Sequence, residues 1–66
     1  MITEIGIVAG DIWHYLDGHG ESLFSKVLSG IDKPKPLALM SLGWLAREGH
    51  VIVREDGNDL RVALRR

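Results

Sequence analysis

The 66-residue sequence contains no cysteine, and this absence excludes disulfide bonds and thiolate zinc sites together. A chain of this length buries only about 60% of the surface that it exposes when unfolded, so it can form one small core. Domains with so little core commonly gain stability from a disulfide, a metal or a second subunit. Because cysteine chemistry is missing, the length and composition favour a homodimer.

Long apolar runs are also absent. No stretch approaches the roughly 20 residues of a membrane-spanning helix, and the N-terminus lacks a basic-then-apolar secretion signal. We therefore expect a cytoplasmic protein without membrane contact. No internal repeat, low-complexity tract or linker interrupts the chain, so residues 1–66 are expected to form a single domain.

The sequence has no excess of positive charge. Eight Lys and Arg stand against nine Asp and Glu, which gives a net charge of −1 and no global field that attracts nucleic acid. The charges are nevertheless unevenly distributed. Residues 1–32 carry one basic and five acidic side chains, and residues 33–66 carry seven basic and four acidic ones. A basic face in the second half can still hold phosphate.

The first half shows helical spacing of apolar residues. Apolar side chains recur every three or four positions over residues 5–19, which predicts a helix there. Thr3 is its expected N-cap, and Gly18 and Gly20 supply the stop signal.

A second, shorter helix is expected over residues 22–29, where the same spacing appears in miniature. Ser22 is its expected N-cap, and Gly30 its end. Two turns of helix are unstable alone, so packing against its neighbours must hold this segment.

A third helix should begin between Pro34 and Pro36, because proline is tolerated in the first turn of a helix, where amide groups lack partners. The apolar pattern continues to Glu48, and Gly49 is a natural left-handed cap.

The period then changes from helical to alternating. Residues 51–53 form a β-branched run, and apolar side chains alternate over residues 60–64. The intervening Asp56-Gly57-Asn58-Asp59 consists of turn residues that tolerate positive φ, so a β-hairpin is predicted. The expected core follows from these patterns: Ile5, Val8, Ile12, Leu16, Leu23, Val27, Leu28, Ala38, Leu42, Leu45, Val51, Val53, Leu60, Val62 and Leu64.

This order of elements resembles the winged helix-turn-helix fold, an α+β class with three helices followed by a two-stranded β-hairpin wing. The segment Leu45-Ala46-Arg47-Glu48-Gly49-His50-Val51-Ile52 looks like the junction between recognition helix and wing. Ala9-Gly10-Asp11-Ile12-Trp13, taken with Gly43-Trp44-Leu45-Ala46-Arg47-Glu48, is similar to small stand-alone winged-helix proteins of bacteria and archaea, a family of unknown function.

The resemblance implies a DNA-binding, transcription-related module whose third helix enters the major groove. It places contact residues at the entrance of that helix, on its surface and on the wing, namely Lys33, Lys35, Ser41, Arg54 and Arg61. Basic side chains at these positions would neutralise phosphates of double-stranded DNA.

The third helix offers few groups that read bases, because Ser41 is surrounded by apolar residues. Clustered apolar side chains on a surface more often mark a contact with protein than with DNA. The alternative is therefore a protein–protein interaction or dimerisation module without sequence-specific DNA binding. Its expected interface comprises Trp13, Leu39, Met40 and Trp44, although the residues of the third helix could equally belong to the core.

Neither a metal site nor catalysis is expected. His14 and His19 are five residues apart, which does not place them on one helix face, and no carboxylates complete a ligand set. The chain has no cysteine nucleophile, no paired acid and base, and no phosphate-binding glycine loop. We expect no cofactor, and a domain this small has little room for a small-molecule ligand.

Overall fold

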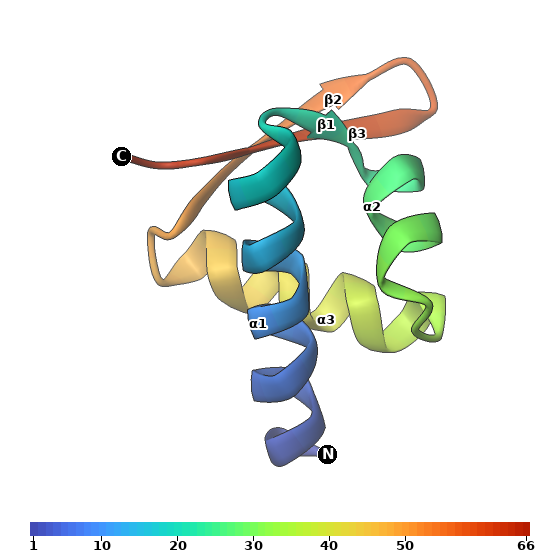
Figure 1. The fold of residues 1–66 in the computed structure, drawn as a ribbon, viewed down its shortest axis with the longest axis vertical. Coiled ribbons are helices and arrows are strands. Elements are labelled where there is room, and N and C mark those ends of the chain that lie inside the picture. The colour runs from blue at the N-terminus through green and yellow to red at the C-terminus, as the bar shows by residue number, and fades with distance from the viewer.

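Three helices pack beneath a small antiparallel sheet in the computed structural model, which describes residues 1–66 (Figure 1). The elements are α1 (Ile2–His19), β1 (Ser22–Leu23), α2 (Phe24–Ile31), α3 (Lys35–Arg47), β2 (Val51–Asp56) and β3 (Asp59–Leu64). The predicted order of three helices and a hairpin is therefore confirmed, and so is the α+β class.

The sheet has three strands rather than the two expected, in the order β1-β3-β2. Ser22 and Leu23 pair antiparallel with Val62 and Arg61 and so form the additional strand. Sequence patterns could not reveal this strand, because two residues are too few to show alternation. The second helix consequently begins at Phe24, and the predicted start at Ser22 is wrong.

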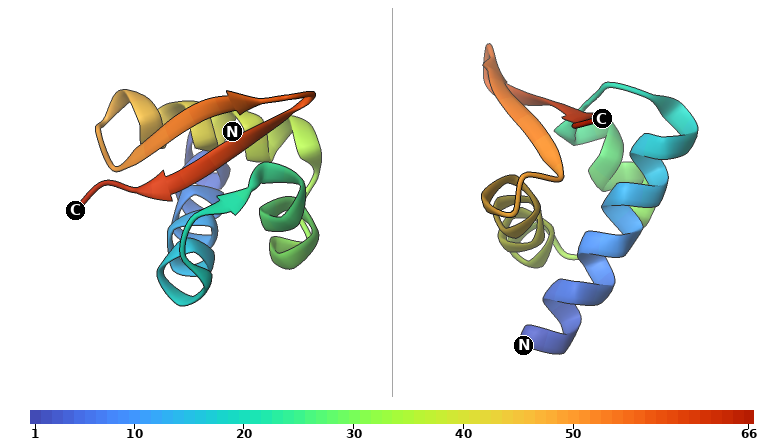
Figure 2. Two further views of the ribbon diagram at one scale, coloured as in Figure 1. Left: turned by 90° about the horizontal axis from the view of Figure 1, so that it is seen from above. Right: turned by 90° about the vertical axis from the view of Figure 1, so that its left-hand side faces the viewer.

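The core lies where α1 crosses α3 and where both meet the inner face of the sheet (Figures 1 and 2). Spacing of three and four residues along α1 puts one apolar stripe against α3. The buried apolar side chains are Val8, Ala9, Ile12, Leu16, Phe24, Val27, Ala38, Leu42, Leu45, Val51 and Val62. Most of them are predicted core residues.

Six predicted core residues lie outside this cluster. Leu28, Val53, Leu60 and Leu64 are partly buried and pack against it, whereas Ile5 and Leu23 are half-buried and do not belong to it. Leu23 is in register with Arg61 and so shares the outer face of the sheet. Phe24 takes a buried place instead, since the strand shifts the start of the helix by two residues.

At the ends of α1 the predicted N-cap, Thr3, is wrong, and the predicted stop at Gly20 is confirmed. The helix begins at Ile2 rather than behind Thr3, because the Ile5 amide donates to the Met1 carbonyl at 3.0 Å. At the other end Gly20 has a φ of 78°, and its amide donates to the Leu16 carbonyl at 2.7 Å. The positive φ favours glycine at this position.

The hairpin turn caps α2 from 34 residues away. The N-cap position of α2 is Leu23, which has no polar side chain, and the hydroxyl of the predicted cap Ser22 donates to Gly20 instead. The Ser25 amide donates to Oδ1 of Asp59 at 3.3 Å, and the Leu60 amide donates to the same oxygen at 2.7 Å. Asp59 thus performs across the fold the task of a local N-cap.

A second close contact joins α1 to α2. A Cβ atom added at Gly30 would lie 2.3 Å from Cε2 of Tyr15, which is closer than carbon atoms can pack. The Tyr15 ring is itself stacked on His19, with ring centroids 3.9 Å apart. Gly30 was expected to end α2, but the helix continues to Ile31 and ends at Asp32, whose φ is 54°. Gly30 instead permits the two helices to approach.

We expect Gly30→Ala to lower the free energy of unfolding by about 1 to 3 kcal/mol, because the added methyl group overpacks the contact with Tyr15. Gly18→Ala is the matched control, since a Cβ there meets no atom within 4 Å and should stabilise α1 by up to about 1 kcal/mol. Urea denaturation of both variants measures the difference. Equal effects would show that the Tyr15 contact does not constrain residue 30.

Asp59 should make the free energy of unfolding depend on pH in the acid range. Hydrogen bonding from Ser25, its side chain foremost, and then from the Leu60 backbone lowers the pKa of Asp59 below its usual 3.8. A lowered folded-state pKa stabilises the fold above about pH 3.8, and this contribution is lost as the pH falls through the folded-state value. Asp59→Asn should therefore be less stable than wild type at pH 7, with a gap that narrows in acid.

Chemical denaturation between pH 7 and pH 3 measures that gap. Glu55→Gln on the same hairpin is the control, because its carboxylate makes no hydrogen bond or ion pair. A constant gap between Asp59→Asn and wild type across the acid range would contradict the capping role.

Candidate nucleic-acid interface

The outer side of α3 is a helical surface that the fold leaves uncovered. Ala38, Ser41, Leu42 and Leu45 face the core, while the opposite residues are exposed. The right-hand view of Figure 2 shows α3 nearly end-on, with α1 on one side of it and no element of the chain on the other. This outer side is where the fold would meet a large partner.

Ser41 does not belong to this outer side, and its prediction as a nucleic-acid contact is wrong. Its exposed fraction is 0%, and its hydroxyl donates to the Leu37 carbonyl at 2.8 Å, within the helix. The reason is geometric, because position 41 is three residues after Ala38 and four before Leu45 and so shares the buried stripe with them. A small hydroxyl that satisfies its own helix fits the core at low cost.

Three of the four predicted basic contacts are paired with acidic side chains. Nζ of Lys33 lies 3.7 Å from Asp11, and a guanidinium nitrogen of Arg54 lies 3.2 Å from Glu21. Arg61 contacts Asp56 at 2.7 Å, and this hydrogen bond, followed by the charge of Asp56, raises the pKa of the guanidinium. Lys35, the fourth contact, has no ion pair.

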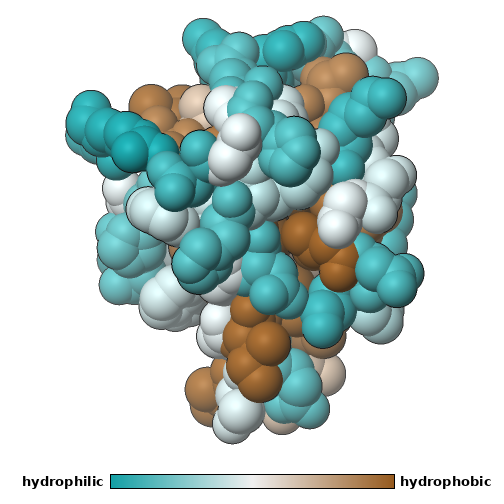
Figure 3. Space-filling model, in the orientation of Figure 1, coloured by the Kyte–Doolittle hydropathy of each residue, from teal (hydrophilic) through white to brown (hydrophobic).

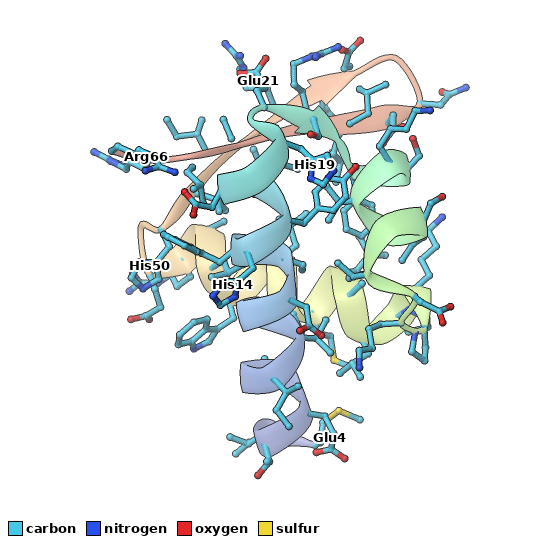
Figure 4. The ribbon with its side chains drawn as sticks, in the orientation of Figure 1. Glu4, His14, His19, Glu21, His50 and Arg66 are labelled. Carbon is cyan, nitrogen blue, oxygen red and sulfur yellow. The ribbon has the colours of Figure 1, made fainter.

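The four predicted basic residues do not form one surface. Arg54 and Arg61 are directly opposite in the hairpin register and project from the outer face of the sheet, where Glu21 lies within 3.7 Å of both. Lys35 lies on the other side of the sheet, in a hollow of about 330 Å³ beside Leu39 and Leu60. Figure 4 shows Glu21 at the sheet end of α1, away from α3.

The tip of the hairpin is acidic. Glu55, Asp56 and Asp59 flank the turn, and Gly57 gives it a φ of 62°. Asp56 is occupied by Arg61 and Asp59 by α2, whereas Glu55 is unpaired. This tip repels phosphate, so any contact of the wing with a polyanion must come from its arginines.

Arg47 is a basic residue that the sequence analysis did not select. It lies exposed in the last turn of α3 and makes no ion pair. Positions 35, 39, 43 and 47 follow one another at four-residue steps, and each step turns about 40° around the axis, so this ridge winds by about 120° from Lys35, beside α2 and the hairpin turn, to Arg47 on the outer side. Lys35 and Arg47 end this ridge, with Leu39 and Gly43 between them. The sequence signal that identifies Arg47 is its place in the row of four-residue steps that begins at Lys35.

The predicted apolar interface is exposed but divided. Leu39, Met40 and Trp44 have exposed fractions of 41%, 43% and 47%, so none of them belongs to the core. Leu39 faces α2 and the hairpin turn, whereas Trp44 faces the start of α1. Five helical residues rotate a side chain by about 140°, which explains why the two do not form one patch.

Trp13 lies on α1 and does not contact Leu39. The guanidinium of Arg66 lies 5.9 Å from the centre of the Trp13 ring and also pairs with Asp17. The cation over the ring ties the C-terminus to α1. Trp13 is half-buried as a result.

Each histidine has a partner within the chain. Nδ1 of His14 is 2.7 Å from the Gly10 carbonyl, and Nδ1 of His19 is 2.9 Å from the Tyr15 carbonyl, so each bonds within α1. His50 packs against Trp44, with ring centroids 6.0 Å apart. No three His, Asp or Glu side chains lie close enough together to hold a metal ion.

Comparison with known proteins places this geometry in a family. A family model described as "Winged helix-turn-helix domain (DUF2582)" matches residues 1–64. An uncharacterized protein of Methanocaldococcus jannaschii, MJ1608, is 38% identical over 58 residues, which make up 85% of this chain and 83% of that protein. None of the helices has the length and apolar character needed to cross a membrane. The chain belongs to the DUF2582 family of winged helix-turn-helix domains.

Proposed function

We propose that this domain is a non-enzymatic module that binds double-stranded DNA through the outer side of α3. The observation that carries the proposal is the exposed face of α3 with two cations that form no ion pair, Lys35 in its first turn and Arg47 in its last. Membership of a winged helix-turn-helix family supports the same placement of the third helix. We also propose that the module has a transcription-related role and that it acts in the cytoplasm.

The spacing of the two cations suits a groove. Lys35 and Arg47 are separated by about 18 Å along the helix axis at 1.5 Å per residue. The major groove is about 12 Å wide, so long side chains at the two helix ends reach its phosphate rims while the middle of α3 lies within it. Gly43 in that middle carries no side chain and allows close approach to the DNA.

The side chains in the middle of α3 determine how far the proposed binding distinguishes one DNA sequence from another. Leu39 and Met40 have no hydrogen-bonding group for base edges, and Ser41 is buried. Apolar side chains contact only the methyl group of thymine in the major groove. The proposed binding is therefore dominated by phosphate contacts and has little sequence preference.

Arg54 and Arg61 are secondary contacts in this proposal. Both are held by Glu21 or Asp56, and the side chains of all four are at least one-third exposed. Exposed ion pairs contribute at most about 1 kcal/mol, so DNA phosphates can compete with the carboxylates for the arginines. This competition lowers the contribution of Arg54 and Arg61 to DNA affinity relative to that of Lys35 and Arg47, which form no ion pair.

We expect Lys35→Ala and Arg47→Ala each to weaken binding to mixed-sequence duplex DNA and to flatten its salt dependence. Each lost phosphate contact reduces the slope of log K against log salt by about 0.9. Fluorescence anisotropy with a labelled duplex between low and physiological salt measures the slope. Arg66→Ala is the charge-matched control, because Arg66 is bound to α1 through Asp17 and Trp13.

Absence of binding even at low salt would reject the DNA proposal and leave the protein-interaction module as the function. An unchanged slope in Lys35→Ala and Arg47→Ala, with a lower slope in Arg66→Ala, would move the binding face away from α3.

A second prediction tests the wing. Glu21→Gln removes the carboxylate that lies near both Arg54 and Arg61. Affinity for duplex DNA should rise about two- to fivefold at low salt, since a competing exposed ion pair is worth up to about 1 kcal/mol. Glu4→Gln is the matched control, because it removes one negative charge at the far end of α1 (Figure 4).

The gain should disappear when Glu21→Gln is combined with Arg54→Ala and Arg61→Ala. Equal gains from Glu21→Gln and Glu4→Gln would contradict a wing contact and assign the effect to net charge.

A further inference from the structure

The first two turns of α1 project beyond the body of the molecule. Figures 1 and 2 show the N-terminal end of α1 extending past α3 on the side away from the sheet. None of residues 2–7 is buried, although three of them are isoleucine. Ile2 has an exposed fraction of 87% and Ile7 of 57%. These turns therefore expose apolar side chains that the rest of the chain does not cover.

A hollow lies beside this projection. Ile2, Ile5, Gly6 and Trp44 enclose about 390 Å³ between α1 and α3, and none of the four carries a charge. A Cβ at Gly6 would meet no atom within 4 Å, so the floor of the hollow is open. Figure 3 shows apolar surface gathered over the projecting end of the molecule. The face thus combines an exposed apolar knob, Ile2, with an apolar hollow next to it.

The charges of the projection cancel one another. Among residues 1–10 only the N-terminal ammonium and Glu4 are ionisable, and they lie 2.8 Å apart. Hydrogen bonding from that ammonium lowers the pKa of Glu4. A surface without net charge can meet a copy of itself without repulsion, whereas a charged surface requires a partner of opposite sign.

We propose that a second copy of this chain covers this face, in a two-fold dimer in which Ile2 of each copy enters the hollow of the other. A two-fold interface must be self-complementary, with the same patch on both subunits, and a knob adjoining a hollow in one neutral patch meets that requirement. Open Gly6 and Gly10 on α1 allow the two α1 helices to pack closely.

The area that a small dimer interface needs is a modest part of the chain's surface. Small specific interfaces bury about 600 Å² per partner, roughly one-seventh of the 4363 Å² that the chain exposes. The dimer covers Trp44 and is measured without DNA, so the outcome of its test is separate from that of the proposed DNA binding.

Sedimentation equilibrium without DNA tests the dimer, between about 10 μM and about 1 mM, a range that covers micromolar to millimolar Kd values. We expect the apparent mass to approach twice the 7.3 kDa of one chain. Ile2→Glu should raise the dimer Kd at least about tenfold, because it buries an unpaired charge. Ile7→Glu is the matched control, since residue 7 lies about 140° away around α1 and should leave the Kd unchanged.

Trp13→Phe leaves Trp44 as the only tryptophan, and its quenching by acrylamide should decrease as the dimer forms. Circular dichroism of Ile2→Glu checks that the monomer remains folded, as its high exposure predicts. A wild-type monomer throughout the range would overturn the proposal and leave a different protein as the occupant. Equal losses in Ile2→Glu and Ile7→Glu, or unchanged quenching of Trp44 in a dimer, would overturn the location.

Discussion

The packing of α1 across α3 is the contact on which the rest of the molecule depends. The two helices supply seven of the 11 buried apolar side chains, namely Val8, Ala9, Ile12 and Leu16 from α1 and Ala38, Leu42 and Leu45 from α3. A chain this short has no second core to compensate. The same contact orients α3 with four residues inward and its remaining surface outward. The candidate interface is therefore a direct result of how the core is filled.

The sequence predicts the elements well because each carries its own periodicity. The three-and-four spacing of α1, the prolines before α3 and the Asp-Gly-Asn-Asp turn all describe local geometry, and all appear where expected. The failures are contacts between distant residues. Ser25 takes its cap from Asp59, Gly30 accommodates Tyr15, and β1 exists only through pairing with β3. Local patterns hold no information on such pairs.

The candidate site was harder to predict for an electrostatic reason. The acidic first half and basic second half suggested a face that binds phosphate, yet the fold uses that asymmetry internally. Asp11, Asp17 and Glu21 from the first half pair with Lys33, Arg66, Arg54 and Arg61 from the second. Only the three-dimensional structure shows which cations remain unpaired. Lys35 and Arg47 are such cations, and they stand at the two ends of a row of four-residue steps that winds by about 120° around α3.

Amide chemical-shift mapping of the labelled protein with a mixed-sequence DNA duplex at low salt tests the central claim most directly. The account predicts that the largest perturbations fall on the outer side of α3, at Leu39, Met40, Gly43 and Arg47, with smaller ones at Arg54 and Arg61. Perturbations centred on the first turns of α1, or an unperturbed α3 in a saturated complex, would contradict it.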